Sequence, residues 1–184
     1  SGSGKSSFLH LLSLLDKPSS GKILFLGEDT KNFGENKKDQ IRKRNISIIF
    51  QDNNLLSDFT TIENVIMPLI IRGENYKSSL KKAENILKQV NLLERSNHFP
   101  SELSGGEQQR VAIARSIIAE TDLILADEPT GNLDFKTSRN IFSYFIKLKK
   151  LKKAVLFATH NRELANKADY KLSISNGHIK RVNG

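Results

Sequence analysis

Hydrophobic residues gather into short runs separated by longer segments with helical periodicity. The runs at 123–126 and 154–158 are apolar throughout, and the run at 46–50 is apolar except for Ser47. Continuous apolar runs of this length are typical of strands that are buried on both faces of a parallel sheet. Residues 23–26 form a further short run closed by Gly27, which predicts another strand. Strands that alternate with helices predict a mostly parallel α/β sheet.

Helical spacing of apolar residues marks the segments between these strands. The sequence predicts helices in the segments 8–15, 39–44, 61–71, 79–90, 107–120, 137–150 and 162–166. Residues 29–38 are polar and predict a loop. Near the end of the chain, residues 170–175 and 178–182 flank Asn176-Gly177, a dipeptide that favours a β-hairpin. We therefore expect three parts: 1–51 and 118–184 form the sheet core, and 52–117 forms an inserted helical subdomain.

The first residues match the end of a phosphate-binding loop. Ser1-Gly2-Ser3-Gly4-Lys5-Ser6 fits the motif G-x-x-x-x-G-K-[ST] without its first two positions. In such a loop the backbone N–H groups bind phosphate oxygens, and the lysine reaches the β- and γ-phosphates. Ser6, the last residue of the motif, is expected to bind Mg²⁺, and Ser7 is expected near the α-phosphate. A Ser/Gly linker has the same composition, but the apolar helix that follows favours the phosphate loop.

Two carboxylates follow the apolar run at 123–126. Asp127 and Glu128 stand at the end of a predicted strand, before Pro129. Asp127 suits a Mg²⁺ ligand, and Glu128 suits the general base that polarises an attacking water. Two acids that begin a turn are the alternative interpretation. The phosphate loop upstream favours the hydrolytic role.

A Ser-Gly-Gly turn precedes the predicted helix at 107–120. The backbone N–H groups of Ser104, Gly105 and Gly106 would attract a phosphate at the positive end of the helix dipole. Gln51 follows another predicted strand, where its amide could lie near Mg²⁺ and the attacking water. A polar residue that merely ends an exposed strand is the alternative for Gln51. Arg110 and Arg115, on the predicted helix at 107–120, are expected to form structural salt bridges.

Composition limits the classes of protein that remain. The chain has 184 residues, 29 Lys and Arg against 20 Asp and Glu, a net charge of +9 and no cysteine. Disulfides and thiolate metal sites are therefore excluded. The lysines are scattered, and no basic stripe with interleaved aromatic residues occurs, so no nucleic-acid partner is expected. No apolar run reaches the roughly 20 residues that span a bilayer.

Three motifs of the chain resemble those of the ATP-binding subunits of ABC transporters. They are the phosphate loop, the segment Leu103-Ser104-Gly105-Gly106-Glu107-Gln108 and the segment 123–128. This resemblance implies a P-loop NTPase (RecA-like) core and ATP hydrolysis with ATP and Mg²⁺. It implies that Gln108 belongs to the ATP-binding signature and that His160 contacts the γ-phosphate. Asp134, in Gly131-Asn132-Leu133-Asp134, would lie at the interface of a homodimer; an ordinary turn that caps the next helix is the alternative.

The segments 58–69 and 125–134 are most similar to the ATPase of lipoprotein-releasing systems. The resemblance implies that the chain binds transmembrane subunits at the cytoplasmic face of the inner membrane and powers lipoprotein release. Macrolide-export or cell-division complexes are the alternatives within the family. A non-transport ATPase that acts on nucleic acid or ribosomes is the alternative of another class. We also expect an N-terminally truncated chain, because the strand before the phosphate loop and an adenine-stacking aromatic residue are missing from it.

Overall fold

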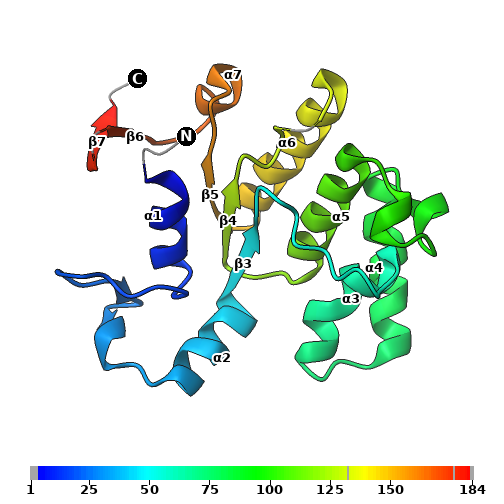
Figure 1. Ribbon diagram of the computed structural model, residues 1–184, viewed down its shortest axis with the longest axis horizontal. Coiled ribbons are helices and arrows are strands. Elements are labelled where there is room, and N and C mark those ends of the chain that lie inside the picture. Colours follow the sequence, from blue (N-terminus) through cyan, green and yellow to red (C-terminus); the bar gives the residue numbers. More distant parts are fainter. Residues whose placement is uncertain (1–3, 132, 176, 183–184) are drawn as a thin grey trace.

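A three-stranded parallel sheet, flanked by helices, organises the chain (Figure 1). The computed structural model describes residues 4–131, 133–175 and 177–182. In chain order its elements are α1 (Lys5–Leu12), β1 (Leu24–Phe25), β2 (Glu28–Asp29), the 3-10 helix η1 (Thr30–Asn32), α2 (Glu35–Asn45), β3 (Ile46–Ile49), α3 (Thr61–Ile71), α4 (Tyr76–Gln89), the 3-10 helices η2 (Leu93–Arg95) and η3 (Pro100–Glu102), α5 (Gly105–Ile118), β4 (Leu123–Asp127), α6 (Phe135–Lys150), β5 (Ala154–Ala158), α7 (Arg162–Ala165), β6 (Lys171–Ser175) and β7 (His178–Val182). This arrangement confirms the predicted α/β fold class.

The sheet has the strand order β3-β4-β5, and both pairs are parallel. Leu123 of β4 is aligned with Ile46 on one side and with Ala154 on the other. Parallel neighbours need crossover connections, and helices supply them here. Because all three strands run the same way, the residues that follow them gather at one edge of the sheet.

Strand β4 joins the two hydrophobic cores of the molecule. Ile124 and Ala126 pack into the larger core with helices α3, α4, α5 and α6. Leu125, which is fully buried, belongs to the smaller core with Leu9 of α1. Successive side chains of a strand point to opposite faces, so α1 covers one face of the sheet and α5 and α6 cover the other (Figure 1). Burying one leucine such as Leu125 contributes about 1.5–3 kcal/mol.

The segment between β3 and β4 is mainly helical. Helices α3, α4 and α5 pack together through buried apolar side chains, including Val65, Leu87 and Ile113. Thr60 starts α3 with a capping box: its backbone N–H donates to the Glu63 carboxylate at 2.8 Å. The structure confirms the predicted helix at 61–71 with the same bounds.

Two sequence predictions near the start of the chain were wrong in their bounds. Helix α1 covers Lys5–Leu12, so Ser7 is helical and the helix stops before Leu15. It stops because Leu14 adopts a left-handed φ of 60°. Helix α2 begins at Glu35, inside the predicted loop. Its buried apolar residue is Ile41, so the helix has little hydrophobic periodicity to detect.

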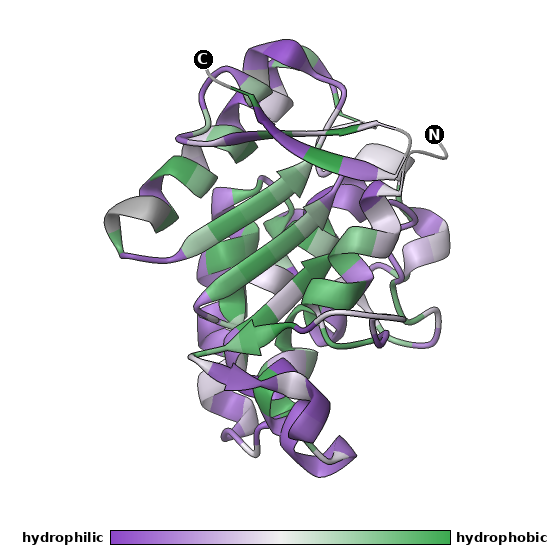
Figure 2. Cartoon of the chain, turned by 90° about the vertical axis from the view of Figure 1, so that its left-hand side faces the viewer, coloured by the Kyte–Doolittle hydropathy of each residue, from purple (hydrophilic) through white to green (hydrophobic). Residues whose placement is uncertain are grey.

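Two antiparallel hairpins accompany the sheet. In β1-β2 the turn residues Leu26 and Gly27 both have positive φ, 50° and 87°. In β6-β7, Lys171 is aligned with Val182, which confirms the predicted pairing, although Asn176 lies outside the described residues. Figure 2 shows the parallel strands as a hydrophobic band above the hydrophilic helix α2. Within the described part of the chain, the helices are all too short or too polar to cross a bilayer.

Candidate functional site

The N-terminus of α1 lies at the carboxyl end of the sheet. Gly4 precedes the helix with φ 92°, a backbone conformation that favours glycine. Lys5, Ser6 and Ser7 form its first turn, where backbone N–H groups lack partners inside the helix. These groups and the helix dipole make the position suitable for an anion. The predicted residues Ser1, Gly2 and Ser3 lie outside the described residues.

Ser6 and Lys5 each contact a residue at or just after the carboxyl end of a strand. The Ser6 hydroxyl donates a hydrogen bond to Oδ2 of Asp127, the last residue of β4, at 2.5 Å. Lys5 Nζ lies 3.4 Å from Nε2 of His160, which follows β5 by two residues. Residues predicted as a phosphate loop, a Mg²⁺ ligand and a γ-phosphate contact are therefore neighbours.

Glu128 is held in a strained backbone conformation. Its φ is 46°, in the left-handed region, and its N–H donates to the Ala158 carbonyl at 2.9 Å. Its side chain is largely buried, 19% exposed, and Oε1 lies 3.6 Å from His160 Nε2. Among the described residues, Oε1 finds no hydrogen-bond partner. A buried carboxylate oxygen without a partner is positioned to accept a proton or hydrogen bond from water or a ligand.

The oxygen atoms of this cluster suit a hard divalent cation. Ser6 and Asp127 offer a hydroxyl and a carboxylate, the ligand types that Mg²⁺ prefers. Over the described ranges, no group of three or more His, Asp or Glu side chains forms a self-sufficient metal centre. A cation here would share its coordination with a ligand such as a phosphate group, as Mg²⁺ does in nucleotide-hydrolysing sites.

Gln51 is set apart from this cluster. It lies exposed in the turn after β3. The described hydrogen bonds do not connect it to Lys5, Ser6 or Glu128. The structure therefore brings together Lys5, Ser6, Asp127, Glu128 and His160, and it leaves Gln51 outside their contacts.

The Ser-Gly-Gly turn begins α5 and uses its own capping box. Ser104 is the N-cap, and both its N–H and its hydroxyl donate to the Glu107 carboxylate at 2.8 Å. These bonds, led by the Ser104 backbone N–H, lower the pKa of Glu107, which also pairs with Arg95 at 3.2 Å. The sequence signal for this role of Glu107 is the pattern S-x-x-E at 104–107.

Gln108 and its neighbour Gln109 have different surroundings. The side-chain amide of Gln108 donates to the Pro100 carbonyl at 3.0 Å and to that of Leu103 at 3.3 Å. Gly105 is open: a Cβ added there would meet nothing within 4 Å. Gln109 is fully buried, and neither of its amide atoms finds a partner among the described residues. At the N-terminus of α5, Ser104 and Gly105 are therefore exposed to solvent, and hydrogen bonds from Gln108 hold the turn that precedes them.

Asp134 and Arg115 form bonds within this chain. Asp134 Oδ1 accepts from the Thr137 N–H at 3.0 Å and so caps α6, as the alternative interpretation held. The hydrogen bond with Thr137 is the main cause of its lowered pKa. The predicted salt bridges of Arg115 are wrong: its guanidinium donates to the backbone carbonyls of Asn53 and Asn54, at 2.8 and 2.9 Å.

Sequence comparison places this site among known proteins. A family model described as ABC transporter matches residues 1–131. The chain is 45% identical to the lipoprotein-releasing system ATP-binding protein LolD of Syntrophus aciditrophicus (strain SB), over 97% of this chain and 81% of that protein. It is 48% identical to the protein of the same name from Rickettsia bellii (strain RML369-C), over 94% of this chain and 77% of that protein.

A solved structure shares the whole fold. It is described as the dimeric structure of MJ0796, a bacterial ABC transporter cassette. The TM-score is 0.93 and the identity 35%, over 100% of this chain and 83% of that one.

Proposed function

Because this chain is an ATP-hydrolysing member of the ABC transporter family, we propose that it powers the release of lipoproteins from the bacterial inner membrane. Attached transmembrane subunits would carry out the release, and the chain would lie peripherally at the cytoplasmic face. The observation that supports this substrate most directly is the identity of 45–48% to two lipoprotein-releasing ATP-binding proteins. ATP hydrolysis would take place at the cluster formed by Lys5, Ser6, Asp127, Glu128 and His160.

We assign the site residues as follows. The N–H groups at the start of α1 bind the phosphates, and Lys5 reaches the terminal ones. Ser6 and Asp127 are the residues that would hold Mg²⁺. When bound, Mg²⁺ neutralises charge on the phosphate oxygens. Gln51 would add its side-chain amide to the Mg²⁺ ligands; its exposure in the turn after β3 leaves that amide open to a bound ligand.

Glu128 is proposed as the general base. Its Oε1 lacks a hydrogen bond in the described chain, so it can accept the proton of the attacking water. The water oxygen forms a bond to the γ-phosphorus as the bond to the β-γ bridging oxygen breaks, yielding ADP and phosphate. Nε2 of His160 lies 3.6 Å from Glu128 Oε1 and 3.4 Å from Lys5 Nζ, so the imidazole can orient both the carboxylate and the ammonium group.

We further propose that two copies complete each other's sites. Ser104, Gly105, Gly106 and Gln108 of one copy would face the phosphates held by the other, with Asp134 at the interface. The exposure of Ser104 and Gly105 supports this assignment, as does the dimeric form described for the neighbour structure. Residues 52–117 would act as a helical subdomain between the two parts of the core.

Reconstitution tests the proposed substrate. The intact protein and its membrane subunits are placed in proteoliposomes that contain a lipoprotein, and the lipoprotein released into solution is measured with and without ATP. We expect release that depends on ATP and is lost in Glu128→Gln. ATP hydrolysis without lipoprotein release, in a complex that exports another compound, would refute the substrate and leave the ATPase activity intact.

A further inference from the structure

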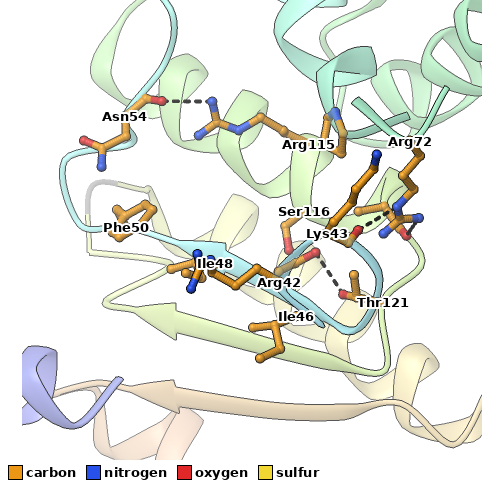
Figure 3. A pocket seen from close by; sticks show the side chains of 13 residues that line it. Arg42, Lys43, Ile46, Ile48, Phe50, Asn54, Arg72, Arg115, Ser116 and Thr121 are labelled. Atoms are coloured by element: carbon orange, nitrogen blue, oxygen red, sulfur yellow. Dashed lines mark hydrogen bonds between the residues drawn. The ribbon is translucent and has the colours of Figure 1, made fainter. Parts of the chain in front are cut away.

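Helix α5 carries polar contacts near both of its ends. In its last turn, Arg115 donates a hydrogen bond to the backbone carbonyl of Asn54 at 2.9 Å, beside a cavity (Figure 3). At its N-terminus, the Glu107 carboxylate holds Ser104, the first residue of the Ser-Gly-Gly turn, and is itself paired with Arg95. The N-terminal contacts decide which donors this turn can offer to a phosphate.

The Ser104 hydroxyl has a single hydrogen, and within this chain Glu107 takes it. Ser104 Oγ donates to Glu107 Oε2 at 2.8 Å, and the Ser104 backbone N–H donates to the same oxygen at 2.8 Å. Oγ in turn accepts from the Glu107 N–H at 3.3 Å. A phosphate oxygen is an acceptor, so the Ser104 hydroxyl must leave Glu107 before it can donate to a phosphate.

Glu107 also places a negative charge close to where that phosphate would lie. Acceptors lie roughly 2.8 Å from a hydroxyl oxygen, so a phosphate oxygen bound to Ser104 would come within about 6 Å of the Glu107 carboxylate. The Glu107 side chain is only 20% exposed, so solvent screens the repulsion between the two anions only in part. The bonds from Ser104 lower the pKa of Glu107, which keeps the carboxylate charged. The approach of a phosphate therefore requires a compensating cation.

Arg95 supplies this cation. Its Nε donates to Glu107 Oε1 at 3.2 Å, whereas Ser104 uses Oε2, so the two contacts do not compete for one oxygen. Arg95 is the last residue of η2, and its Nη1 lies 3.2 Å from Nε2 of His98. The arginine can therefore stay paired with Glu107 while the Ser104 hydroxyl turns toward another acceptor.

We propose that Arg95 is a positioning residue for ATP hydrolysis. It neutralises Glu107, so that the Ser104 hydroxyl can exchange the Glu107 carboxylate for a phosphate oxygen held by a second copy. In the free chain Glu107 keeps this hydroxyl occupied, and the phosphate replaces Glu107 as the acceptor when two copies meet. Arg95 acts through Glu107 and not on the phosphate itself. The inference rests on the proposed function, in which the turn at 104–106 faces the nucleotide of another copy.

Dimerisation of the intact protein with ATP tests this role. Glu128→Gln serves as the parent, because it lacks the proposed general base and does not consume the nucleotide. Size-exclusion chromatography gives the ATP concentration at which half of the protein is dimeric. Arg95→Gln should raise this concentration about fivefold, since it leaves the Glu107 charge uncompensated beside the phosphate.

Two further variants separate charge compensation from simple bracing of the turn. Glu107→Gln added to Arg95→Gln should restore the parent's ATP requirement, because the repelling carboxylate is gone. Arg95→Lys keeps the positive charge and should stay within about twofold of the parent.

Lys82→Gln is the matched control. The side chains of Lys82 and Arg95 are 47% and 49% exposed, and Lys82 pairs with Glu74 at 2.8 Å in the same helical segment. Its loss should leave the ATP requirement unchanged. Binding of ATP to a single chain should be equal in all these variants, because Lys5 and the N-terminus of α1 are unaltered.

Dimerisation of Arg95→Gln at the parent's ATP concentration would overturn the inference. A weakened Arg95→Gln that Glu107→Gln fails to restore would overturn it too, because Arg95 would then only brace the turn. In both cases the ATP-dependent dimer of the parent would leave the proposed two-copy site standing. A parent that binds ATP and forms no dimer would refute the two-copy site, and this inference with it.

Discussion

The hydroxyl of Ser6 donates a hydrogen bond to the carboxylate of Asp127 at 2.5 Å, joining the first turn of α1 to the end of β4. The two residues are far apart in the sequence. The packing of α1 on the sheet brings them together, because Leu9 of α1 and Leu125 of β4 lie in the same hydrophobic core. Glu128 and His160 follow two adjacent strands at the carboxyl edge of the sheet, so the hydrolytic groups share one location.

Removal of the Glu128 charge tests the general base. Glu128→Gln should lower ATP turnover by about 10²- to 10⁴-fold, the usual contribution of a general base. Nucleotide affinity should be retained, since Lys5 and the N-terminus of α1 are unchanged, and the closed dimer should accumulate with ATP. Steady-state hydrolysis, nucleotide titration and size-exclusion chromatography give the three readouts. Unchanged turnover would remove Glu128 from this role.

The backbone at Glu128 should impose a stability cost. A left-handed φ disfavours residues with a Cβ by roughly 1–2 kcal/mol. Glu128→Gly relieves this strain, although glycine also gains entropy in the unfolded chain. We therefore expect Glu128→Gly to unfold about 1–4 °C above Glu128→Ala. Both variants lack the carboxylate, so thermal unfolding compares the backbone effect alone; a lower Tm for the Gly variant would contradict it.

Gly105 tests whether the signature acts on a second copy. A Cβ at Gly105 meets nothing within 4 Å in its own chain, so Gly105→Ala should fold normally. If this position faces the nucleotide of a partner copy, hydrolysis should fall at least tenfold while a single chain still binds ATP. Gly34→Ala is the matched control, since Gly34 also stands at a helix N-terminus with open space around it. Equal hydrolysis in the two variants would argue against the assignment.

The Ser104-Glu107 capping box should make stability depend on pH. The pKa of Glu107 is lowered in the folded chain, so its contribution is present above the pKa of the unfolded chain. As pH falls through the lower, folded pKa, that contribution is lost. In Glu107→Gln, the free energy of unfolding should therefore fall less steeply below the ordinary glutamate range. Glu84→Gln, at an exposed position on α4, should keep the wild-type slope in acid-unfolding titrations.

Continuous apolar runs were sufficient to predict the central sheet. The runs at 46–50, 123–126 and 154–158 correspond to β3, β4 and β5, because strands buried on both faces need apolar residues at nearly every position; Ser47 of β3 is the one polar residue in these runs. The start of α2 was missed, because it is stabilised by polar contacts. The Lys38 ammonium pairs with the Glu35 carboxylate at 2.9 Å, and such pairs carry no hydrophobic period.

The sequence predicted which residues form the site, but it did not predict their backbone conformation or their hydrogen bonds. The sequence predicted five site residues that lie together in the structure: Lys5, Ser6, Asp127, Glu128 and His160. The left-handed backbone of Glu128 has no sequence signal, since it depends on the bond from its N–H to Ala158 on the adjacent strand. The hydrogen bonds of Arg115 to two carbonyls were equally hidden, because charge alone suggested an acidic partner.

The position of β4 has a consequence for local unfolding. The strand is paired on both sides, whereas β3 and β5 are each paired on one side within the described sheet, so opening β4 breaks more backbone hydrogen bonds than opening either neighbour. Its amide hydrogens should therefore exchange with solvent more slowly than those of β3 and β5. Asp127 and Glu128 stand at the end of this most protected strand. Fluctuations of the surrounding loops can then admit and release ligands while the two carboxylates keep their positions.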